Sequence, residues 1–193
     1  MIIGITGGIG SGKSRVANYW SRVFDLSLIN LDTICRQLLT KGQPGWLALK
    51  KQFGSRFFQL GNHLDRPAFR QALFCEESLR NTVDNLLHPL AKSCMKKELQ
   101  RYADTVVLVE IPLLFEAGWQ QEVDKIVVVF ADRETRCARL MVRDGVTRKE
   151  AYQALRIQLF FEEKIMAADN VVDNSGFWSD TCLQILHLGR LYI

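Results

Sequence analysis

Short, continuous apolar stretches rich in β-branched residues recur along this chain. Strands of a parallel sheet that are buried on both faces have this pattern, whereas half-exposed strands alternate between apolar and polar positions. The expected strands are Ile2 to Ile5, Leu26 to Ile29, Val106 to Ile111, Ile126 to Phe130 and the short pair Val171 to Val172.

Apolar residues at helical spacing occupy the segments between these strands. The expected helices are Lys13 to Phe24, Leu86 to Tyr102, Arg133 to Arg143, Arg148 to Ala167 and Phe177 to Leu191. His88-Pro89 lies at the start of the helix expected from Leu86. Proline is favoured in the first turn of a helix, so it supports this start. Alternating strands and helices predict an α/β fold with a central parallel sheet flanked by helices.

Two segments interrupt this alternation. The chain has no convincing strand between Ile29 and Thr105, and a basic helical pair lies between Phe130 and Val171. We interpret both as helical insertions at the carboxyl edge of the sheet, which is where open α/β folds bind their ligands.

Composition and charge narrow the class of partner. The chain has 193 residues, of which 48% are hydrophobic and 24% charged, as expected for one globular domain. The net charge of +4 suits anionic small molecules and is too small to indicate nucleic acid. The basic segment is also short and lacks interleaved aromatic residues. We therefore expect no nucleic-acid partner.

The cysteines and the apolar stretches indicate the cellular compartment in which we expect the protein. Five cysteines are scattered without a CxxC spacing: Cys35, Cys75, Cys94, Cys137 and Cys182. Unpaired thiols in odd number favour a reducing compartment over a disulfide framework or a zinc site. The apolar stretch Met1 to Ile5 is too short for a signal peptide, and no run approaches membrane-spanning length. We expect a cytoplasmic protein without a membrane partner, either a monomer or a weak homo-oligomer.

A glycine-rich stretch, GITGGIGSGKS, follows the first expected strand. It matches G-x-x-x-x-G-K-[ST] from Gly7 to Ser14, with a strand before it and an amphipathic helix after it. The alternative is a glycine-rich turn at an ordinary strand–helix joint, and the pattern, its flanks and its position together favour the phosphate-binding loop. The backbone N–H groups of such a loop surround phosphate oxygens, a lysine reaches the β- and γ-phosphates, and a hydroxyl ligates Mg²⁺. The expected nucleotide site comprises Gly8, Gly10, Ser11, Gly12, Lys13, Ser14 and Arg15, with Ser14 as a metal ligand.

The loop predicts a nucleotide but not a reaction. A GTPase would need an Asn-Lys-x-Asp motif, which the chain lacks, and we interpret DNSG at Asp173 to Gly176 as a turn. A small-molecule kinase needs only the loop, an acceptor pocket, a group that orients the attacking hydroxyl, and arginines that neutralise the transferring phosphate.

Asp32 is the candidate for the group that orients the hydroxyl, since it follows the second expected strand. Its carboxylate could accept a proton from a substrate hydroxyl or lie near Mg²⁺. It could equally be the N-cap of a helix from Thr33 to Leu39, a position that aspartate favours. The residues alone leave both interpretations open.

Arginines crowd the segment after the fourth strand. Arg136, Arg139 and Arg143 share one helix face, and guanidinium groups bind phosphate oxygens in bidentate fashion. A solvated basic face is the alternative. Next to a phosphate-binding loop we favour a lid that uses Arg139 and Arg143, and we expect Arg133 and Arg136 to be surface residues.

Three further residues remain ambiguous from the residues alone. Glu110, near the end of the third expected strand, either assists Mg²⁺ or is an ordinary strand-end charge. His88 is either an acceptor-site residue or a core or capping histidine, and Arg66 either meets an acceptor phosphate or belongs to a surface turn. Pro112 forces an irregular exit from the strand and directs Leu113, Leu114 and Phe115 towards the cleft.

In their order and spacing these stretches resemble the dephospho-coenzyme A kinase family over nearly the whole chain. The matching stretches are GITGGIGSGKS, LDTICRQLL, LDR, LLHPL, IPLLFEAG, RLMVRDGVTRKEA and ADNVVDNSG. The resemblance implies phosphorylation of the ribose 3′-hydroxyl of dephospho-coenzyme A with ATP and Mg²⁺. It also implies a P-loop core, a helical acceptor-binding insertion and a helical lid.

The resemblance also implies roles for single residues. Asp32 becomes the base or hydroxyl-orienting group and a metal ligand, and Lys13 and Arg143 join it as catalytic residues. The acceptor site would use Asp32, Arg66, His88, Leu113 and Glu116. ATP would also contact Arg139, Arg143 and Asn174.

This chain departs from the family at three places. Arg15 stands where relatives usually have threonine, and that position contributes mainly its N–H group. Asn30 stands where many relatives have a first aspartate, which leaves Asp32 to act alone. Pro67 directly follows Arg66.

The expected division has three parts. The nucleotide-binding core comprises residues 1–29, 105–132 and 168–193, the acceptor region residues 30–104, and the lid residues 133–167. Two other functions remain to be separated from this one: a kinase of another small alcohol or nucleotide, and a non-catalytic nucleotide-binding switch.

Overall fold

A computed structural model describes residues 1–102, 105–156 and 161–193 of the protein. These residues form two compact units. The first comprises residues 1–30 and 102–193, and the second residues 31–101.

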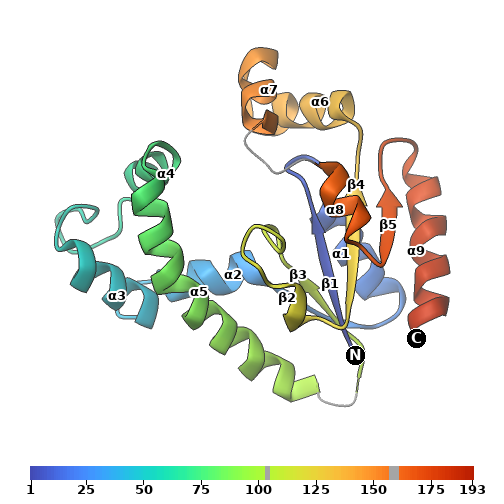
Figure 1. The fold of residues 1–193 in the computed structure, drawn as a ribbon, viewed down its shortest axis with the longest axis horizontal. Helices are drawn as coiled ribbons and strands as arrows, with labels where there is room; N and C mark the ends of the chain where they lie inside the picture. Colours follow the sequence, from blue (N-terminus) through green and yellow to red (C-terminus); the bar gives the residue numbers. More distant parts are fainter. Residues whose placement is uncertain (103–104, 157–160) are drawn as a thin grey trace. The chain divides into compact units, whose positions relative to one another are not determined.

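The first unit is built on a five-stranded parallel sheet with the order β2-β3-β1-β4-β5 (Figure 1). The strands are β1 (Ile2–Gly7), β2 (Ser27–Asn30), β3 (Val107–Glu110), β4 (Lys125–Phe130) and β5 (Asn170–Asp173). All five expected strands and their parallel arrangement are confirmed, with ends that differ by a residue or two. The first strand, β1, is central, so the loop that follows it lies at the middle of the carboxyl edge.

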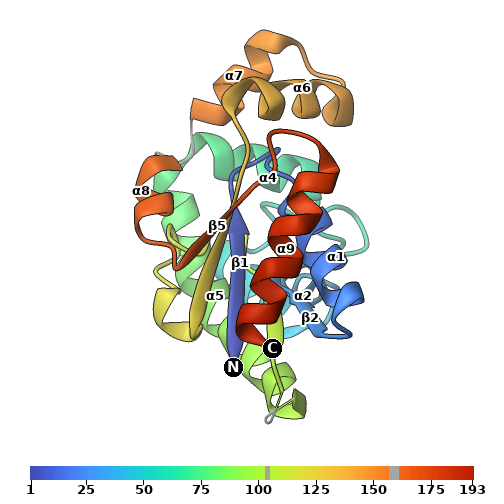
Figure 2. The same cartoon turned by 90° about the vertical axis from the view of Figure 1, so that its right-hand side faces the viewer.

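Two helices cover one face of this sheet, α1 (Lys13–Val23) and α9 (Trp178–Tyr192), as Figure 2 shows. Alternate residues of the strands, such as Ile3, Ile5 and Val127, point to this face and pack against Trp20 and Ile185. The helices therefore bury the apolar stripes that their sequence pattern predicts.

The segment between β3 and β4 supplies apolar side chains next to β1. Gly4 leaves little room for a side chain, since a Cβ atom there would lie 3.0 Å from Val123 and 3.1 Å from Leu114. Leu114 and Trp119 are buried in this segment, which also holds the 3₁₀ turn η2 (Gln120–Glu122). The expectation that Leu114 is directed towards the cleft is wrong, because its side chain is buried beside Gly4 of β1.

A helical hairpin follows β4. It consists of α6 (Arg133–Asp144) and α7 (Arg148–Arg156), which pack through Cys137, Leu140 and Ala151 (Figure 1). The expected helix from Arg133 is confirmed. The one expected over Arg148 to Ala167 is found as α7 and the short α8 (Phe161–Met166), and residues 157–160 of it lie outside the described part.

The second unit is helical. It contains α2 (Leu31–Leu38), α3 (Pro44–Phe53), α4 (Arg66–Cys75) and α5 (Glu77–Leu99), and η1 (Gln100–Tyr102) follows. Its core holds Leu49, Phe57, Phe69, Leu79 and Val83. Within residues 31–101, the pairing is limited to one isolated bridge between Phe58 and Leu64, so the expected absence of strands is confirmed there.

The expected start of the helix around Leu86 is wrong. The helix α5 begins at Glu77 and continues through Pro89, which lies in its interior rather than in its first turn. Proline lacks the N–H that would bond to the carbonyl four residues earlier. Apolar contacts on both sides of it, at Val83 and Ala91, hold the helix in one piece. Nowhere in the described ranges does a helix combine the length and the apolar character needed to cross a bilayer.

Candidate active site

The glycine-rich loop joins β1 to α1 at the carboxyl edge of the sheet. Gly10 and Gly12 have φ angles of 77° and 86°, in the left-handed region that favours glycine. The Ser11 N–H donates to the Gly8 carbonyl at 3.1 Å, which closes a turn. The helix then begins at Lys13, and the first N–H groups of any helix lack partners within it. With the positive end of the helix dipole beside them, these groups make an anion-binding site.

Side chains from two other elements hold the outer side of this loop. Arg139 of α6 donates to the Gly10 and Ser11 carbonyls at 3.3 and 3.2 Å and to the Asn174 carbonyl at 2.8 Å. The Asn174 side chain, 2% exposed, donates to the Ser11 carbonyl at 2.7 Å. Burial lowers the pKa of the Arg139 guanidinium, and the charge of Arg15 lowers it further. The structure thus brings Arg139 and Asn174 onto the predicted loop.

Gly12 shows why this arrangement needs glycine. A Cβ atom there would lie 2.3 Å from Nδ2 of Asn174. The neighbouring Arg15 points elsewhere, since its guanidinium lies 3.7 Å from the centre of the Trp178 ring. This stacking agrees with the expectation that position 15 serves the loop through its backbone.

A buried carboxylate lies beside the start of α1. The Ser14 hydroxyl donates to Oε1 of Glu110 at 2.5 Å, and the Asn30 amide donates to Oε2 at 2.5 Å. Glu110 is 1% exposed at the last position of β3, in register with Asn30 of β2. Its position is therefore set by the sheet and not by a flexible loop.

This pair fits a magnesium ion. Mg²⁺ takes oxygen ligands, keeps several waters and is usually held by one or two protein groups together with phosphates. Ser14 and Glu110 offer a hydroxyl and a carboxylate next to the phosphate loop. Across the described residues no group of three or more His, Cys, Asp or Glu could form an all-protein cage.

Asp32 lies in the first turn of α2 and is exposed. The interpretation as an N-cap is wrong, because the helix already begins at Leu31, directly after β2 ends at Asn30. Burial raises the pKa of the Cys35 thiol to about 11, and the negative charge of Asp32, one turn earlier, adds to the shift.

Arg66 and His88, the predicted acceptor residues of the second unit, lie on α4 and α5. Arg66 is the first residue of α4, whose N-cap is Asp65, and it donates to the Arg36 carbonyl at 3.3 Å. Pro67 occupies the first turn, where proline is favoured, so it leaves the position of Arg66 undisturbed. Nε2 of His88 lies 3.6 Å from the Asp84 carboxylate.

Arg66 also borders a hollow on the surface of this unit. The hollow has a volume of about 570 Å³, and Arg66, Pro67, Arg70, Gln71 and Phe74 line it.

The loop after β3 carries the other two predicted acceptor residues. Leu113 is 51% exposed. The Glu116 carboxylate accepts a hydrogen bond of 2.5 Å from Nζ of Lys164, which is only 1% exposed. Sequence reasoning missed Lys164, since its partner is 48 residues away and no local pattern marks it.

The α6 arginines divide differently from the prediction. The expectation that Arg136 is a surface residue is wrong: it is 7% exposed and donates to the Ile9 carbonyl at 2.9 Å, because this face of α6 packs on the loop. Arg133 is exposed, as expected, and lies over the Tyr152 ring. Arg143 pairs with Asp144 through two contacts of 2.8 Å.

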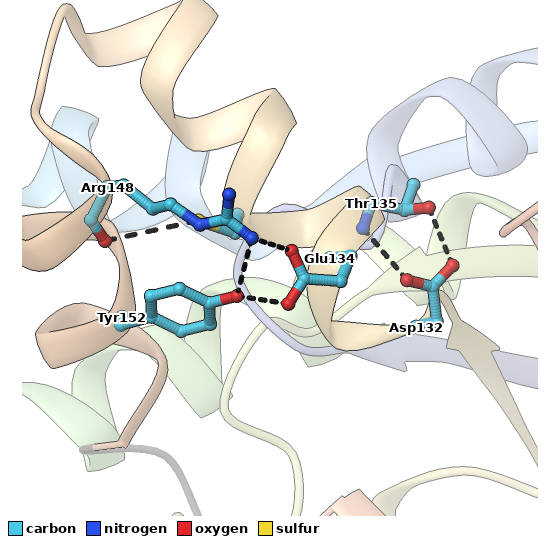
Figure 3. Close-up of polar contacts among 6 residues, drawn as sticks. Asp132, Glu134, Thr135, Arg148 and Tyr152 are labelled. Atoms are coloured by element: carbon cyan, nitrogen blue, oxygen red, sulfur yellow. Dashed lines mark hydrogen bonds and ion pairs between the residues drawn. The ribbon is translucent and has the colours of Figure 1, made fainter.

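Polar contacts tie the two helices of the hairpin together, as Figure 3 shows. Arg148 donates to Glu134 at 2.5 Å, and the Tyr152 hydroxyl donates to the other oxygen of the same carboxylate. Asp132 caps α6 through the N–H and hydroxyl of Thr135, at 2.8 and 2.6 Å. These hydrogen bonds lower the pKa of Asp132. The hairpin is therefore fixed at its base and across its helices.

Comparison with known proteins places this geometry in a family. The family model described as dephospho-CoA kinase matches residues 1–180. A dephospho-CoA kinase of Prochlorococcus marinus (strain MIT 9312) is 36% identical over 193 residues, covering 95% of this chain and 94% of the relative.

Two solved structures have the same fold. A crystal structure from Thermus thermophilus matches with a TM-score of 0.84 and 33% identity over 99% of this chain and 97% of that one. A dephospho-CoA kinase from Campylobacter jejuni matches with a TM-score of 0.71 and 22% identity over 98% and 95% of the two chains. With its P-loop, its parallel sheet and this full-length similarity, the chain belongs to the dephospho-CoA kinase family.

Proposed function

We propose that this protein transfers the γ-phosphoryl group of ATP to the ribose 3′-hydroxyl of dephospho-coenzyme A, which gives coenzyme A and ADP. The observation that carries the proposal is the loop at the carboxyl end of β1, with Lys13 at its end and Ser14 hydrogen-bonded to the buried Glu110. A phosphate-binding loop beside a buried carboxylate is typical of sites that bind ATP and transfer its phosphoryl group. The family match supplies the acceptor.

Charge neutralisation is the main task of the nucleotide side. Phosphate oxygens would accept hydrogen bonds from the N–H groups of Gly10 and Gly12 and from those at the start of α1. The Lys13 ammonium would reach the β- and γ-phosphates. Ser14 and Glu110 would hold Mg²⁺, which when bound offsets charge on the phosphates. Arg143 and Arg139 would serve the transferring group from α6, and Arg139 already contributes by holding the loop.

The acceptor side rests on residues of the second unit and of the loop after β3. Asp32 would accept a hydrogen bond from the 3′-hydroxyl and hold it in line with the γ-phosphorus. Its exposed position in the first turn of α2 leaves the carboxylate open to a substrate. Arg66 and His88 would contact the acceptor, and the hollow beside Arg66 supports this. Leu113 and Glu116 would complete the acceptor site.

We also propose the three-part division of labour: a core of residues 1–29, 105–132 and 168–193, an acceptor region of residues 30–104, and a lid of residues 133–167. The compactness of residues 31–101 as a unit of their own supports the acceptor region. The tied α6–α7 hairpin supports the lid, since closure over a substrate needs a rigid element that excludes water.

The test is ADP release coupled to a dye or to NADH, with Mg²⁺ and ATP and a panel of acceptors. The panel contains dephospho-coenzyme A, adenosine, AMP, shikimate and no acceptor. Turnover with dephospho-coenzyme A alone is the expected result. Turnover with another acceptor would keep the phosphoryl transfer and contradict the substrate.

A matched pair of variants ties the activity to the loop. We expect Lys13→Met to lower kcat by about 100-fold or more, because charge on the transferring phosphate loses its nearest ammonium. Lys97→Met, an exposed lysine of α5, should keep the parent activity. Equal losses in the two variants would mean that the activity does not come from the loop.

A further inference from the structure

Ile9 of the phosphate loop is anchored to the α6–α7 hairpin in two ways. Its side chain packs on the buried core that joins the two helices, which includes Cys137 and Leu140. Its carbonyl oxygen accepts a hydrogen bond of 2.9 Å from Nε of Arg136. The loop therefore contacts α6 at its tip as well as through Arg139.

Arg136 is more deeply buried than the other arginines of α6. It is 7% exposed, while Arg133 and Arg143 on the same helix are exposed. Burying a guanidinium is unfavourable unless hydrogen bonds compensate for lost water. Burial lowers the pKa of Arg136, and the charge of Arg133 lowers it further. The surroundings of this side chain therefore disfavour its positive charge.

The hydrogen bond of Arg136 fixes one peptide plane of the loop. The carbonyl of Ile9 and the N–H of Gly10 belong to the same peptide unit, and in a trans peptide these two groups point in opposite directions. A carbonyl held towards α6 thus directs the Gly10 N–H to the opposite side of the loop. Arg139 and Asn174 act in the same way on the Ser11–Gly12 peptide. Both donate to the Ser11 carbonyl and so orient the Gly12 N–H.

Backbone packing leaves this peptide little freedom. At Gly10, with φ at 77°, a Cβ atom would lie 2.9 Å from the Arg136 carbonyl oxygen and 3.2 Å from its Cα atom. The loop backbone therefore lies directly on the backbone of α6 at the residue whose side chain reaches Ile9. Position 10 requires glycine both for its φ and for this close approach.

We propose that Arg136 is a positioning residue for ATP: its buried guanidinium holds the Ile9–Gly10 peptide so that the Gly10 N–H is aimed at a phosphate oxygen before the nucleotide arrives. The proposal rests on the proposed function only in taking the loop as the ATP site. Preorganised donors avoid the reorganisation that a mobile loop would undergo on binding. We therefore expect loss of this hydrogen bond to weaken the affinity for ATP.

The test measures binding of a fluorescent, non-hydrolysable ATP analogue without any acceptor. The variants are Arg136→Gln and Arg136→Lys, and the control is Arg190→Gln, which removes an exposed guanidinium from α9. We expect both Arg136 variants to weaken binding about 10- to 100-fold, the effect of losing a charge-assisted hydrogen bond. The control should bind like the parent.

Turnover separates positioning from a merely structural role. We expect the KM for ATP to rise while the KM for dephospho-coenzyme A stays the same. A structural role would instead lower the fraction of active protein, seen as a lower kcat with both KM values unchanged, and would overturn the proposal. Guanidinium chloride at low millimolar concentration should restore part of the affinity of Arg136→Ala, whereas sodium chloride should not.

Two outcomes would overturn the inference directly. Parent affinity in Arg136→Gln would show that the hydrogen bond does not matter, and parent affinity in Arg136→Lys would show that charge alone is enough. The lysine variant keeps the charge and most of the length, so it provides the test if the glutamine variant does not fold. Because no acceptor is present, a wrong acceptor in the proposed function leaves this result unaffected.

Discussion

The Ser14 hydroxyl donates a hydrogen bond of 2.5 Å to the Glu110 carboxylate, and so joins the first turn of α1 to the last residue of β3. Both groups are presented by regular elements that pack in the same core, and Glu110 is 1% exposed. A hydroxyl and a carboxylate held in this way form a rigid pair of oxygen ligands beside the phosphate loop.

We expect Glu110→Gln to raise the Mg²⁺ concentration needed for half-maximal turnover by about tenfold or more, because a neutral amide replaces a carboxylate near the ion. The measurement is turnover against Mg²⁺ concentration at fixed ATP. Glu98→Gln, which alters a half-buried carboxylate of α5 that pairs with Arg101, is the control. EDTA should abolish turnover of the parent without unfolding it. An unchanged Mg²⁺ requirement in Glu110→Gln would remove this carboxylate from the metal site.

Asp32→Asn should lower kcat about 100- to 10,000-fold, the range for loss of a general base. The KM for ATP and the melting temperature should stay close to those of the parent, since Asp32 is exposed and does not cap α2. Steady-state kinetics with both substrates checks this. The control is Asp25→Asn, the same change at an exposed turn with φ of 51°, which asparagine tolerates. Parent turnover in Asp32→Asn would exclude Asp32 from the chemistry.

The thiol of Cys35 should report the charge of Asp32. Its pKa is raised to about 11, mainly by burial and then by Asp32. The thiolate is the reactive form, so at pH 8 only about one molecule in a thousand carries it. We expect iodoacetamide to label the exposed Cys75 long before Cys35, and Cys35 to react as the pH approaches 11. Removing the negative charge stabilises the thiolate, so Asp32→Asn should lower this pKa.

Mass spectrometry of peptides labelled at several pH values gives both rates. Rapid labelling of Cys35 at pH 8, or the same pH profile in Asp32→Asn, would contradict this account of its environment.

Gly189→Ala should destabilise the protein by about 1–3 kcal/mol, as overpacked cores do. In an exposed helix the same change would stabilise by about 1 kcal/mol. Here a Cβ atom would lie 2.0 Å from the Phe24 ring, in the contact between α9 and the end of α1. Gly176→Ala is the control, because its nearest neighbour, Asp180, is 3.9 Å from the added atom.

Urea denaturation of both glycine variants, compared by midpoint and slope, measures the difference. Equal midpoints would mean that the ring of Phe24 moves aside without loss of packing.

Local patterns were enough for the sheet and the loop. Buried parallel strands are continuous apolar runs, and a P-loop needs its glycines, lysine and hydroxyl at fixed spacing, so both can be recognised within about ten residues. The start of α5 could not be predicted in this way. A proline indicates a helix start when only its neighbours are considered, but packing of Val83 and Ala91 on both sides outweighs its missing hydrogen bond.

The candidate site divides along the same line. The loop, Asp32 and Arg139 were predicted from spacing and from the family resemblance, and the structure brings Arg139 onto the loop. The burial of Arg136 was not predicted, because the row of arginines on α6 has the pattern of a solvated face. Only the packing of that face on the loop buries it.

The sequence by itself determined the five strands, the phosphate loop and the family, because these depend on residues close together in the chain. Tertiary structure alone decided the partners of charged groups: Glu110 with Ser14, Lys164 with Glu116 and Arg136 with Ile9. Those pairs are separated by 96, 48 and 127 residues. A buried charge takes its role from whatever the fold places against it, and no pattern along the chain carries that information.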